Sequence, residues 1–366
     1  MVNLRPMLEA SAGEWRAHLD RMFERMHFVL GEQVAAFETE FAAALGARCA
    51  VGVGTGTAAI ELVIRAAGLG ESQREVIAPA LTSLFTAQAI LAAGCRPRFC
   101  DVDSGSLLIS AEDAARRVRK RTAAILPVHL YGQPCDLPRL AGLGPMLLQD
   151  ACQAHGARAG GSALTRWSAA AYSFYPTKNL PCLGDGGAVL TDSPALAARL
   201  RLLREGGRKN DQLSRLRGIN SRLDEMQACY LRAFLPNLEA WNVHRARIAA
   251  VYDEALAGCE EVRPLRHREG SVYHLYVVRA RRREPLRRYL AGHGIMTAVH
   301  YPVPLHLHPA FADCGLRRGD LPVAEKACRE IVSLPVWPYM PESMAVEVAE
   351  RIAEFSRQGG TRRRRG

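Results

Sequence analysis

Ser173-Phe-Tyr-Pro-Thr-Lys178-Asn-Leu180 is the stretch of this sequence that decides the fold. Upstream of it, the apolar run Pro145-Met-Leu-Leu148 predicts a buried strand that leads into Asp150, and downstream of it glycines gather in Gly184-Asp-Gly-Gly187. An acidic residue at the carboxyl end of a strand lies where open α/β sheets bind their ligands. The order of acid, lysine and glycines therefore predicts an α/β fold with a ligand site around Lys178.

The residue types in this stretch match what pyridoxal phosphate requires of a protein. That cofactor needs a lysine for the Schiff base, an acidic partner for the pyridine nitrogen, and hydrogen-bond donors for the phosphate. An ionised Asp150 would keep the ring nitrogen protonated, so that the ring draws electrons and a Cα proton can leave. A lone lysine is usually a solvated loop residue. Because Lys178 comes with the other two elements, we predict that it holds this cofactor.

Length and composition set the outer limits. The chain has 366 residues, of which 48% are apolar, so it can bury a large core and is expected to make two domains. It contains no uncharged apolar run of roughly 18 residues, and Met1-Val-Asn-Leu-Arg-Pro6 lacks the apolar centre of a signal peptide. We expect a soluble, cytoplasmic protein with no membrane partner. The ten cysteines show no CxxC pair, which favours buried thiols over disulfides or a metal site.

The net charge of +11 would permit nucleic-acid binding, but the basic residues are dispersed and no helix-turn-helix, finger or RNP pattern accompanies them. We therefore expect no nucleic-acid partner. The surplus charge can instead attract an anionic substrate such as a nucleotide diphosphate. Four of the charges, Arg362–Arg365, follow Gly359-Gly360, and we predict that residues 359–366 form a disordered basic tail.

Helical and strand-like segments alternate along the chain, which favours a mostly parallel sheet covered by helices. Helical periodicity over Arg222–Leu256, interrupted at Pro236, predicts the link between a large domain of residues 1–237 and a smaller one of residues 238–358. Helices are also expected at 32–45, 57–67, 322–331 and 341–357. Strands are expected at 48–53, 75–78, 98–102, 123–129, 169–175, 187–191, 271–278 and 294–300.

A glycine-rich loop, Gly52-Val-Gly54-Thr-Gly56-Thr57-Ala58, lies where the first predicted strand turns into a helix. Glycines let the backbone approach an anion there, and the free N–H groups of the helix start attract phosphate. The alternative is a dinucleotide-binding turn, but the spacing departs from GxGxxG and no clear strand-end acid follows about 20 residues later. Combined with Asp150 and Lys178, the loop predicts the phosphate site of the cofactor.

Several motifs in one order make the chain resemble a known family, the fold-type I, pyridoxal-phosphate-dependent sugar aminotransferases of the DegT/DnrJ/StrS type. The resemblance covers about residues 30 to 340. The motifs that carry it are Gly56-Thr57-Ala58, Val76-Ile-Ala-Pro79-Ala-Leu-Thr82, Pro127-Val-His-Leu-Tyr131-Gly132-Gln-Pro134, Asp150-Ala-Cys-Gln153-Ala-His-Gly156, Ser173–Lys178, Gly184–Gly187, Gly218-Ile-Asn220-Ser-Arg222-Leu-Asp-Glu-Met-Gln227, Tyr273-His-Leu-Tyr276 and Ser333-Leu-Pro-Val336.

The resemblance implies a large domain with a mostly parallel seven-stranded sheet and a smaller C-terminal α/β domain. It also implies roles for single residues. Lys178 would form the Schiff base and move the proton, Asp150 would pair with the pyridinium, and Gln153 would bind the ring hydroxyl. An ordinary polar residue on the first turn of a helix is the alternative for Gln153. The phosphate would be held by Ser173, Gly56, Thr57 and Ala58.

The family's Gly-x-Asn-x-Arg stretch is matched by Gly218-Ile-Asn220-Ser-Arg222, and the resemblance implies that Asn220 reaches the phosphate of the neighbouring subunit in a homodimer with shared active sites. The alternative is that Asn220 or Ser221 caps the long helix that follows. One position departs from the family: many relatives have an aromatic residue after the threonine that matches Thr82, where this chain has Ser83. Phe85 is expected to replace that ring, or to belong to the core.

On the substrate side, the resemblance places a set of basic and aromatic residues at the mouth of the site, where they could meet a diphosphate or a carboxylate, or could equally be solvated surface groups. These residues are Arg208, Lys209, Arg222, His300, Tyr301 and His306, and Asn210 belongs to the same loop as Arg208 and Lys209.

The implied activity is transfer of an amino group from L-glutamate, or L-glutamine, to a nucleotide-linked keto-deoxysugar in amino-sugar biosynthesis, including that of antibiotics. The alternative within the family is a glutamine-dependent aminotransferase of a keto-cyclitol. Outside it, a related dehydratase would carry His in place of Lys178, and a regulator would need an additional DNA-binding domain. A protein that binds the cofactor without turnover stays open.

Overall fold

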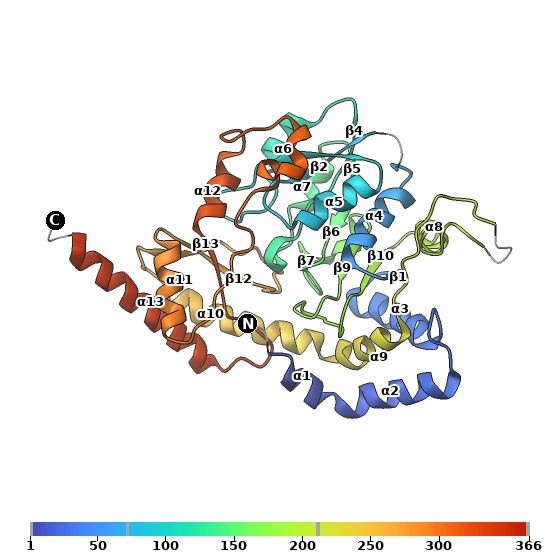
Figure 1. Ribbon diagram of the computed structural model, residues 1–366, viewed down its shortest axis with the longest axis horizontal. Helices are drawn as coiled ribbons and strands as arrows, with labels where there is room; N and C mark the ends of the chain where they lie inside the picture. The colour runs from blue at the N-terminus through green and yellow to red at the C-terminus, as the bar shows by residue number, and fades with distance from the viewer. Residues whose placement is uncertain (1–2, 71–72, 210–212, 364–366) are drawn as a thin grey trace.

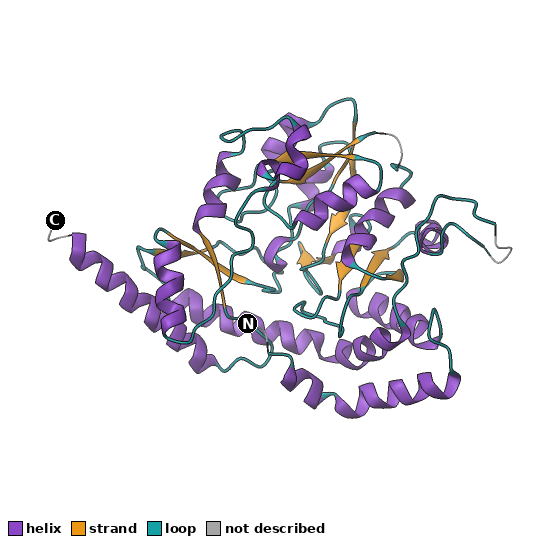
Figure 2. Cartoon of the chain, viewed as in Figure 1, coloured by secondary structure: helices purple, strands orange, loops and turns teal. Residues whose placement is uncertain are grey.

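The computed structural model describes residues 3–70, 73–209 and 213–363, with side chains as far as Arg357 (Figure 1). Strands lie at the centre of the larger part of the chain, with helices on either side of them (Figure 2). Among the helices of these ranges, none is both long and apolar enough to cross a bilayer.

The strands of the larger part form two sheets. One is parallel, in the order β3-β2-β4-β5. The other has the order β1-β10-β9-β6, in which β10 is antiparallel to both neighbours and β6 is parallel to β9. Their bounds are β1 (Cys49–Val53), β2 (Glu75–Pro79), β3 (Arg96–Cys100), β4 (Thr122–Ile125), β5 (Met146–Leu147), β6 (Gln149–Asp150), β9 (Ala170–Ser173) and β10 (Gly187–Thr191); a small hairpin joins β7 (Arg158–Ala159) to β8 (Ser162–Ala163).

The prediction of one mostly parallel seven-stranded sheet is therefore confirmed only as an α/β fold. The strands are short, and the sheet assignment changes where β5 passes into β6. At that point the N–H groups of Leu148 and Asp150 bond towards β4, whereas those of Gln149 and Ala151 bond towards β9. Strand β10 is antiparallel to β9 because the Lys178 loop turns the chain back so that β10 pairs directly with β9. The two strands of a hairpin pair in the same way.

Alternation along the strands fills two cores, one on each face. On β9, Tyr172 packs with Phe41 and Phe174 on one face, while Ala171 faces the other with Val189 of β10. Burial on both faces explains why these strands are continuous apolar runs in the sequence. The helices over the two faces are α3 (Glu32–Leu45), α4 (Gly56–Ala66), α5 (Leu84–Ala92), α6 (Ala111–Arg117), α7 (Leu137–Ala141) and α8 (Pro194–Arg204).

Beneath this part, helices from the N-terminal end of the chain pack with helices from residues 225–255 (Figure 1). Glu225, 1% exposed, accepts the backbone N–H groups of Gly31, Gln33 and Val34 and so caps α3 from a distant position in the sequence. The helices of this layer are α1 (Arg5–Ala10), α2 (Ala12–Arg25), α9 (Glu225–Phe234) and α10 (Leu238–Ala255). The predicted break at Pro236 is a 3₁₀ turn, Leu235–Asn237, and Leu238, where the smaller domain is predicted to begin, is the first residue of α10.

The C-terminal part has its own antiparallel sheet, in the order β11-β12-β13, and a third core of its own. The predicted strand at 294–300 is wrong: that segment makes a single isolated bridge, between Ala298 and Ser333. The elements are β11 (Val262–Pro264), β12 (Tyr276–Ala280), α11 (Arg283–Gly292), α12 (Pro322–Glu330), β13 (Ile331–Leu334) and α13 (Glu342–Arg363), with 3₁₀ turns at Leu130–Gly132, Leu164–Arg166, Leu305–Leu307 and Pro309–Cys314. Helix α13 continues to Arg363, through part of the stretch predicted to be a disordered tail; residues 364–366 lie outside the described residues.

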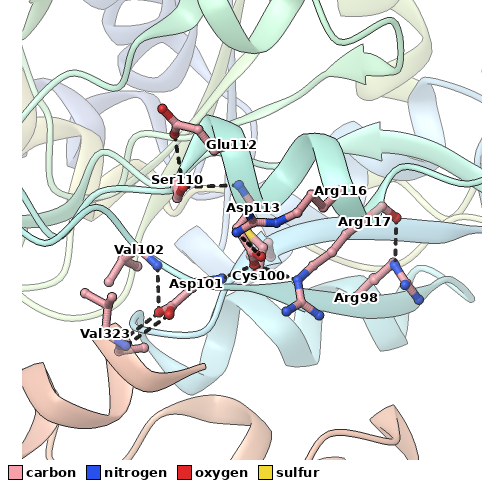
Figure 3. A network of polar contacts seen from close by, with 12 residues as sticks. Arg98, Cys100, Asp101, Val102, Ser110, Glu112, Asp113, Arg116, Arg117 and Val323 are labelled. Carbon is pink, nitrogen blue, oxygen red and sulfur yellow. Dashed lines mark hydrogen bonds and ion pairs between the residues drawn. The ribbon is translucent and has the colours of Figure 1, made fainter. Parts of the chain in front are cut away.

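A polar network ties the two parts together at the end of β3 (Figure 3). The carboxylate of Asp101 accepts the N–H groups of Val323 and Ala324, at 3.0 and 2.7 Å, and so caps the start of α12. The N–H of Asp101 in turn donates to the buried carboxylate of Asp113, which also accepts from Arg117 at 2.6 Å. Because α12 leads into β13, this network fixes the C-terminal sheet relative to the site.

Candidate active site

Lys178 lies on the loop between β9 and β10, and the loop is held at several points. Its N–H donates to the carbonyl of Tyr175 at 2.8 Å, which closes a turn, and Phe174 exchanges backbone bonds with Gly186 and Cys182 at the base of the loop. The next residue, Asn179, is fully buried and donates to Asn242 at 2.8 Å and to the carbonyl of Val272 at 2.9 Å. The lysine therefore projects from a rigid support.

Asp150, at the end of β6, is 4% exposed, and both of its carboxylate oxygens are occupied. Oδ2 accepts the hydroxyl of Thr86 at 2.8 Å, and Oδ1 accepts the N–H of Cys152 at 3.1 Å. The Thr86 hydroxyl also lies 3.2 Å from that of Thr82. Two donors on a buried carboxylate fix its orientation.

The pKa of Lys178 is lowered from its ordinary value, chiefly because burial disfavours the ammonium. Cys152 and the carboxylate of Asp150 act in the opposite direction, which places both close to the lysine. The side chain is half-buried. A lowered pKa raises the fraction of neutral amine near neutral pH, the form that can attack a carbonyl carbon or accept a proton.

The glycine-rich loop meets β9 beside the lysine loop. Gly56 is the first residue of α4, and a Cβ atom there would come within 2.5 Å of the Cβ of Ser173 and 3.0 Å of the Sγ of Cys152. The first N–H groups of a helix have no partner within it, so those of Gly56 and Thr57 are available at this point. The N–H of Ala58 donates to the hydroxyl of Thr55, which caps the helix, at 3.0 Å. The result is a cradle in which position 56 has no side chain, next to the hydroxyl of Ser173.

Gln153 connects the large domain to the predicted substrate residues. Its Oε1 accepts the N–H of Tyr131 at 2.7 Å, and its Nε2 donates to the hydroxyl of Tyr301 at 3.3 Å. Tyr131 donates its own hydroxyl to the carbonyl of His300 at 2.5 Å. Burial, with the charge of Lys178 as the second cause, lowers the pKa of His300 to about 4. His300 therefore lies near Lys178, and Tyr301 lies at Gln153.

The sequence model of the DegT/DnrJ/EryC1/StrS aminotransferase family matches residues 11–353. The chain belongs to this family. A Geobacillus stearothermophilus relative called pleiotropic regulatory protein is 40% identical, over 98% of both chains. The dTDP-3-amino-3,4,6-trideoxy-alpha-D-glucose transaminase of Streptomyces venezuelae is 40% identical, over 95% of both chains. The crystal structure of S. venezuelae DesV in complex with a ketimine intermediate has a TM-score of 0.94 at 39% identity, over 97% of both chains.

The family explains the cradle and the lysine together, because its aminotransferases depend on pyridoxal phosphate. The residues present fit that group. The cradle at Gly56 and Ser173 suits a phosphate, the fixed carboxylate of Asp150 suits a protonated ring nitrogen, and Lys178 is an amine whose pKa is lowered.

The arm is the segment of residues 205–222 that follows α8, and Figure 1 shows it projecting from the body. It carries other residues that are expected to bind ligands in this aminotransferase. Arg208 and Lys209 are exposed, and Asn210 lies outside the described residues. Asn220 is exposed and pairs with Glu205 through a backbone bridge. Helix α9 is preceded by Asp224, so the alternative in which Asn220 or Ser221 caps that helix is wrong.

The C-terminal end of the arm, around Ser221, lies close to the glycine-rich loop. Ser221 accepts the N–H of Gly54 at 3.0 Å through its hydroxyl, which brings the arm's base to the cradle. Arg222 is engaged within the chain, with its guanidinium 3.3 Å from the carboxylate of Glu205.

His306 and Phe85 are the two remaining predicted residues. His306 is fully buried, with Nε2 at 3.2 Å from the carboxylate of Glu325 on α12, and burial lowers its pKa. Phe85 is 55% exposed, and its N–H donates to the hydroxyl of Ser83 at 3.4 Å, which caps α5. In the chain by itself, the Phe85 ring therefore faces solvent.

Sequence reasoning missed three residues that hold this aminotransferase site. Thr86 orients Asp150, Tyr131 orients Gln153, and His155 is fully buried between Tyr172 and Phe174. Burial lowers the pKa of His155 to about 3, with the charge of Lys178 as the next cause, so its ring is neutral beside the lysine loop. Tyr131 and His155 belong to the motifs that carry the family resemblance, which was the only sequence signal for them.

Proposed function

We propose that this aminotransferase moves the amino group of L-glutamate, or of L-glutamine, to carbon 3 of a nucleotide-linked 3-keto-deoxyhexose, with pyridoxal phosphate held on Lys178. The observation that carries the proposal is the pair of Lys178, whose pKa is lowered, and Asp150, whose carboxylate is held by Thr86 and Cys152. Carbon 3 is proposed because the transaminase of Streptomyces venezuelae, 40% identical, is named for a 3-amino sugar.

When bound, the cofactor supplies an aldehyde that takes up the amino group and a ring that draws electrons from the reacting carbon. Asp150 would face the ring nitrogen and keep it protonated. Lys178 would hold the cofactor, and its amine could accept or donate the proton that is moved. Gln153 has its Oε1 occupied by the N–H of Tyr131, so its Nε2 is the atom that can donate to the ring hydroxyl.

The nucleotide end of the substrate would meet the basic residues of the arm. Arg208 and Lys209 are exposed on a segment whose base lies at the cradle, and the chain as a whole carries a net charge of +11. A diphosphate is attracted by such a surface, whereas a cyclitol ketone carries no charge. This difference favours the nucleotide sugar over the keto-cyclitol.

We also propose a homodimer in which Asn220 reaches the partner's phosphate site. An exposed apolar surface lies next to the arm and the lysine loop. Its segments are joined by a backbone bridge between Val29 and Asp224 and by two hydrogen bonds between Leu183 and Gln227, in which each residue donates once. Apolar side chains gathered in this way are typical of an interface. The exposed residues are Phe23, Met26, Phe28, Val29, Leu183 and Met226.

The function is tested with the cofactor-loaded protein. L-glutamate and L-glutamine are added separately while the absorbance of the lysine-bound cofactor is followed, and the aminated protein is then given a panel of dTDP- and UDP-linked 3-keto and 4-keto sugars and scyllo-inosose. We expect loss of the band with one of the donors and an amine product, identified by mass and NMR, only from a 3-keto nucleotide sugar. Product from scyllo-inosose alone would establish the cyclitol alternative, and a band that no amino acid removes would point to a binding protein without turnover.

The dimer is tested by sedimentation of the wild type and of Met226→Glu, with Met344→Glu as a control because Met344 is similarly exposed on α13. Dissociation by Met226→Glu alone is expected. A wild type that sediments as a monomer contradicts the dimer.

A further inference from the structure

The first part of the glycine-rich loop is held by a buried ion pair. The N–H of Gly52 donates to the carboxylate of Glu38 on α3 at 2.8 Å, and the carbonyl of Gly52 accepts the guanidinium of Arg204 on α8 at 2.8 Å. Glu38 and Arg204 are 8% and 6% exposed and lie 2.5 Å from each other. Because the pair satisfies both polar groups of Gly52, it fixes the backbone where β1 ends.

Ser221, at the end of the arm, holds the next part of the loop. Its hydroxyl accepts the N–H of Gly54 at 3.0 Å, and its own N–H donates to the carbonyl of Arg204 at 3.0 Å. A Cβ atom on Gly54 would lie 3.3 Å from the Ser221 hydroxyl, so the two residues are in close contact. Arg204 therefore supports the loop twice, through its guanidinium and through Ser221.

These bonds decide which N–H groups of the loop are left for an anion. Glu38 and Ser221 occupy two that come before the cradle. Those of Gly56 and Thr57, at the start of α4, have no partner within the helix. An anion is thus directed to the helix start, where the helix dipole also attracts it. The family resemblance implies no role for Ser221, which fills an unspecified position of the Gly-x-Asn-x-Arg stretch.

We infer that Ser221 is a positioning residue for the cofactor phosphate. By accepting the N–H of Gly54, it holds the glycine-rich loop in the shape that presents the N–H groups of Gly56 and Thr57. The inference rests on the proposed function, because the phosphate is that of the pyridoxal phosphate at the same site. Since Ser221 acts through the backbone of the loop, loss of its hydroxyl weakens the hold on the phosphate and leaves the hold on the ring and aldehyde unchanged.

The test compares pyridoxal phosphate with pyridoxal, which lacks the phosphate, by absorbance titration of the apoprotein. Ser221→Ala is expected to bind pyridoxal phosphate roughly three- to tenfold more weakly than the wild type, the loss typical of one hydrogen bond. Its affinity for pyridoxal should stay within about twofold of the wild type. Ser221→Thr keeps a hydroxyl and should restore the binding of pyridoxal phosphate. Ser214→Ala is the matched control, since the Ser214 hydroxyl bonds only to carbonyls of the arm, those of Gly206 and Leu216.

Gly54→Ala tests the same contact from the other side. The added Cβ atom would crowd the Ser221 hydroxyl at 3.3 Å, so this variant should bind pyridoxal phosphate more weakly than the wild type. In the Ser221→Ala background that oxygen is gone, and the same change should cost less. Two substitutions that act on one contact are not additive.

The inference is overturned if Ser221→Ala binds pyridoxal phosphate as tightly as the wild type, or if it loses affinity for pyridoxal to the same extent, as a general structural effect would. A Ser221→Thr variant as weak as Ser221→Ala also contradicts it. Should Ser221→Ala not fold, as judged by circular dichroism, Gly54→Ala alone decides: a loss confined to pyridoxal phosphate supports the inference, and any other result contradicts it.

Failure of the proposed function gives a different result. A wild type in which pyridoxal phosphate gives no band that depends on Lys178 would overturn that function itself. A Lys178-dependent band whose affinity is indifferent to position 221 would overturn only the role of Ser221.

Discussion

The hydroxyl of Thr86 offers the sharpest test of how the site holds its carboxylate. Thr86→Val keeps the shape of the side chain but removes the 2.8 Å bond to Oδ2 of Asp150, which is 4% exposed. A hydrogen bond to a charged group contributes about 1.5–3 kcal/mol, and each 1.4 kcal/mol is about tenfold in affinity. The carboxylate would then be held by the N–H of Cys152 alone and would be free to turn away from the ring nitrogen.

We therefore expect Thr86→Val to bind pyridoxal phosphate between about tenfold and a hundredfold more weakly than the wild type. The assay is an absorbance titration of the apoprotein. Thr86→Ser, which keeps the hydroxyl, serves as the control and should stay within about threefold of the wild type. Equal affinities for the Val and Ser variants would show that the Thr86 bond does not orient Asp150 for the cofactor, and would refute the reasoning.

Three further predictions concern protonation and the frame of the site. Burial lowers the pKa of His129 to about 4 and that of His155 to about 3, so the folded protein keeps both rings neutral while the unfolded chain binds protons below about pH 6.5. The free energy of unfolding should fall as the pH drops from 6.5 to 5, by up to about 1.4 kcal/mol per pH unit for each ring, and a flat profile in urea titrations would contradict this. The pKa of Lys178 is lowered from 10.5, and the neutral amine is the reactive form. The rate of cofactor loading should therefore rise with pH and level off, with a midpoint below pH 10.5. A midpoint at or above pH 10.5 would count against the lowered pKa. Glu225→Gln weakens the cap of α3 and should lower the free energy of unfolding by about 1–3 kcal/mol without changing cofactor affinity. An unchanged free energy of unfolding would show that the three N–H bonds to Glu225 contribute little.

The residues that could be predicted from the sequence are those whose role follows from type, order and local pattern. Lys178 and Asp150 were recognisable because each follows a strand pattern, and Gly56 because a strand turns into a helix there. The predicted helices at 32–45, 57–67 and 322–331 are confirmed for the same reason, as α3, α4 and α12. Local periodicity was sufficient for these elements.

The rest depends on pairings between distant segments, which local patterns do not contain. Thr86 reaches Asp150 across 64 positions and Tyr131 reaches His300 across 169. Likewise, the cap of α3 comes from Glu225, 194 positions from Gly31. The pairing of His306 with Glu325 has the same origin: a histidine in a proline-rich loop is indistinguishable in sequence from one that faces a substrate.

The central claim is that one lysine holds the cofactor, and covalent mapping tests it most directly. The loaded protein is reduced with borohydride and digested, and the labelled peptide is sequenced by mass spectrometry, with Lys178→Ala as the control. The account predicts a single pyridoxyl label on Lys178 that is absent from the variant. A label on another lysine, or none at all, would contradict it.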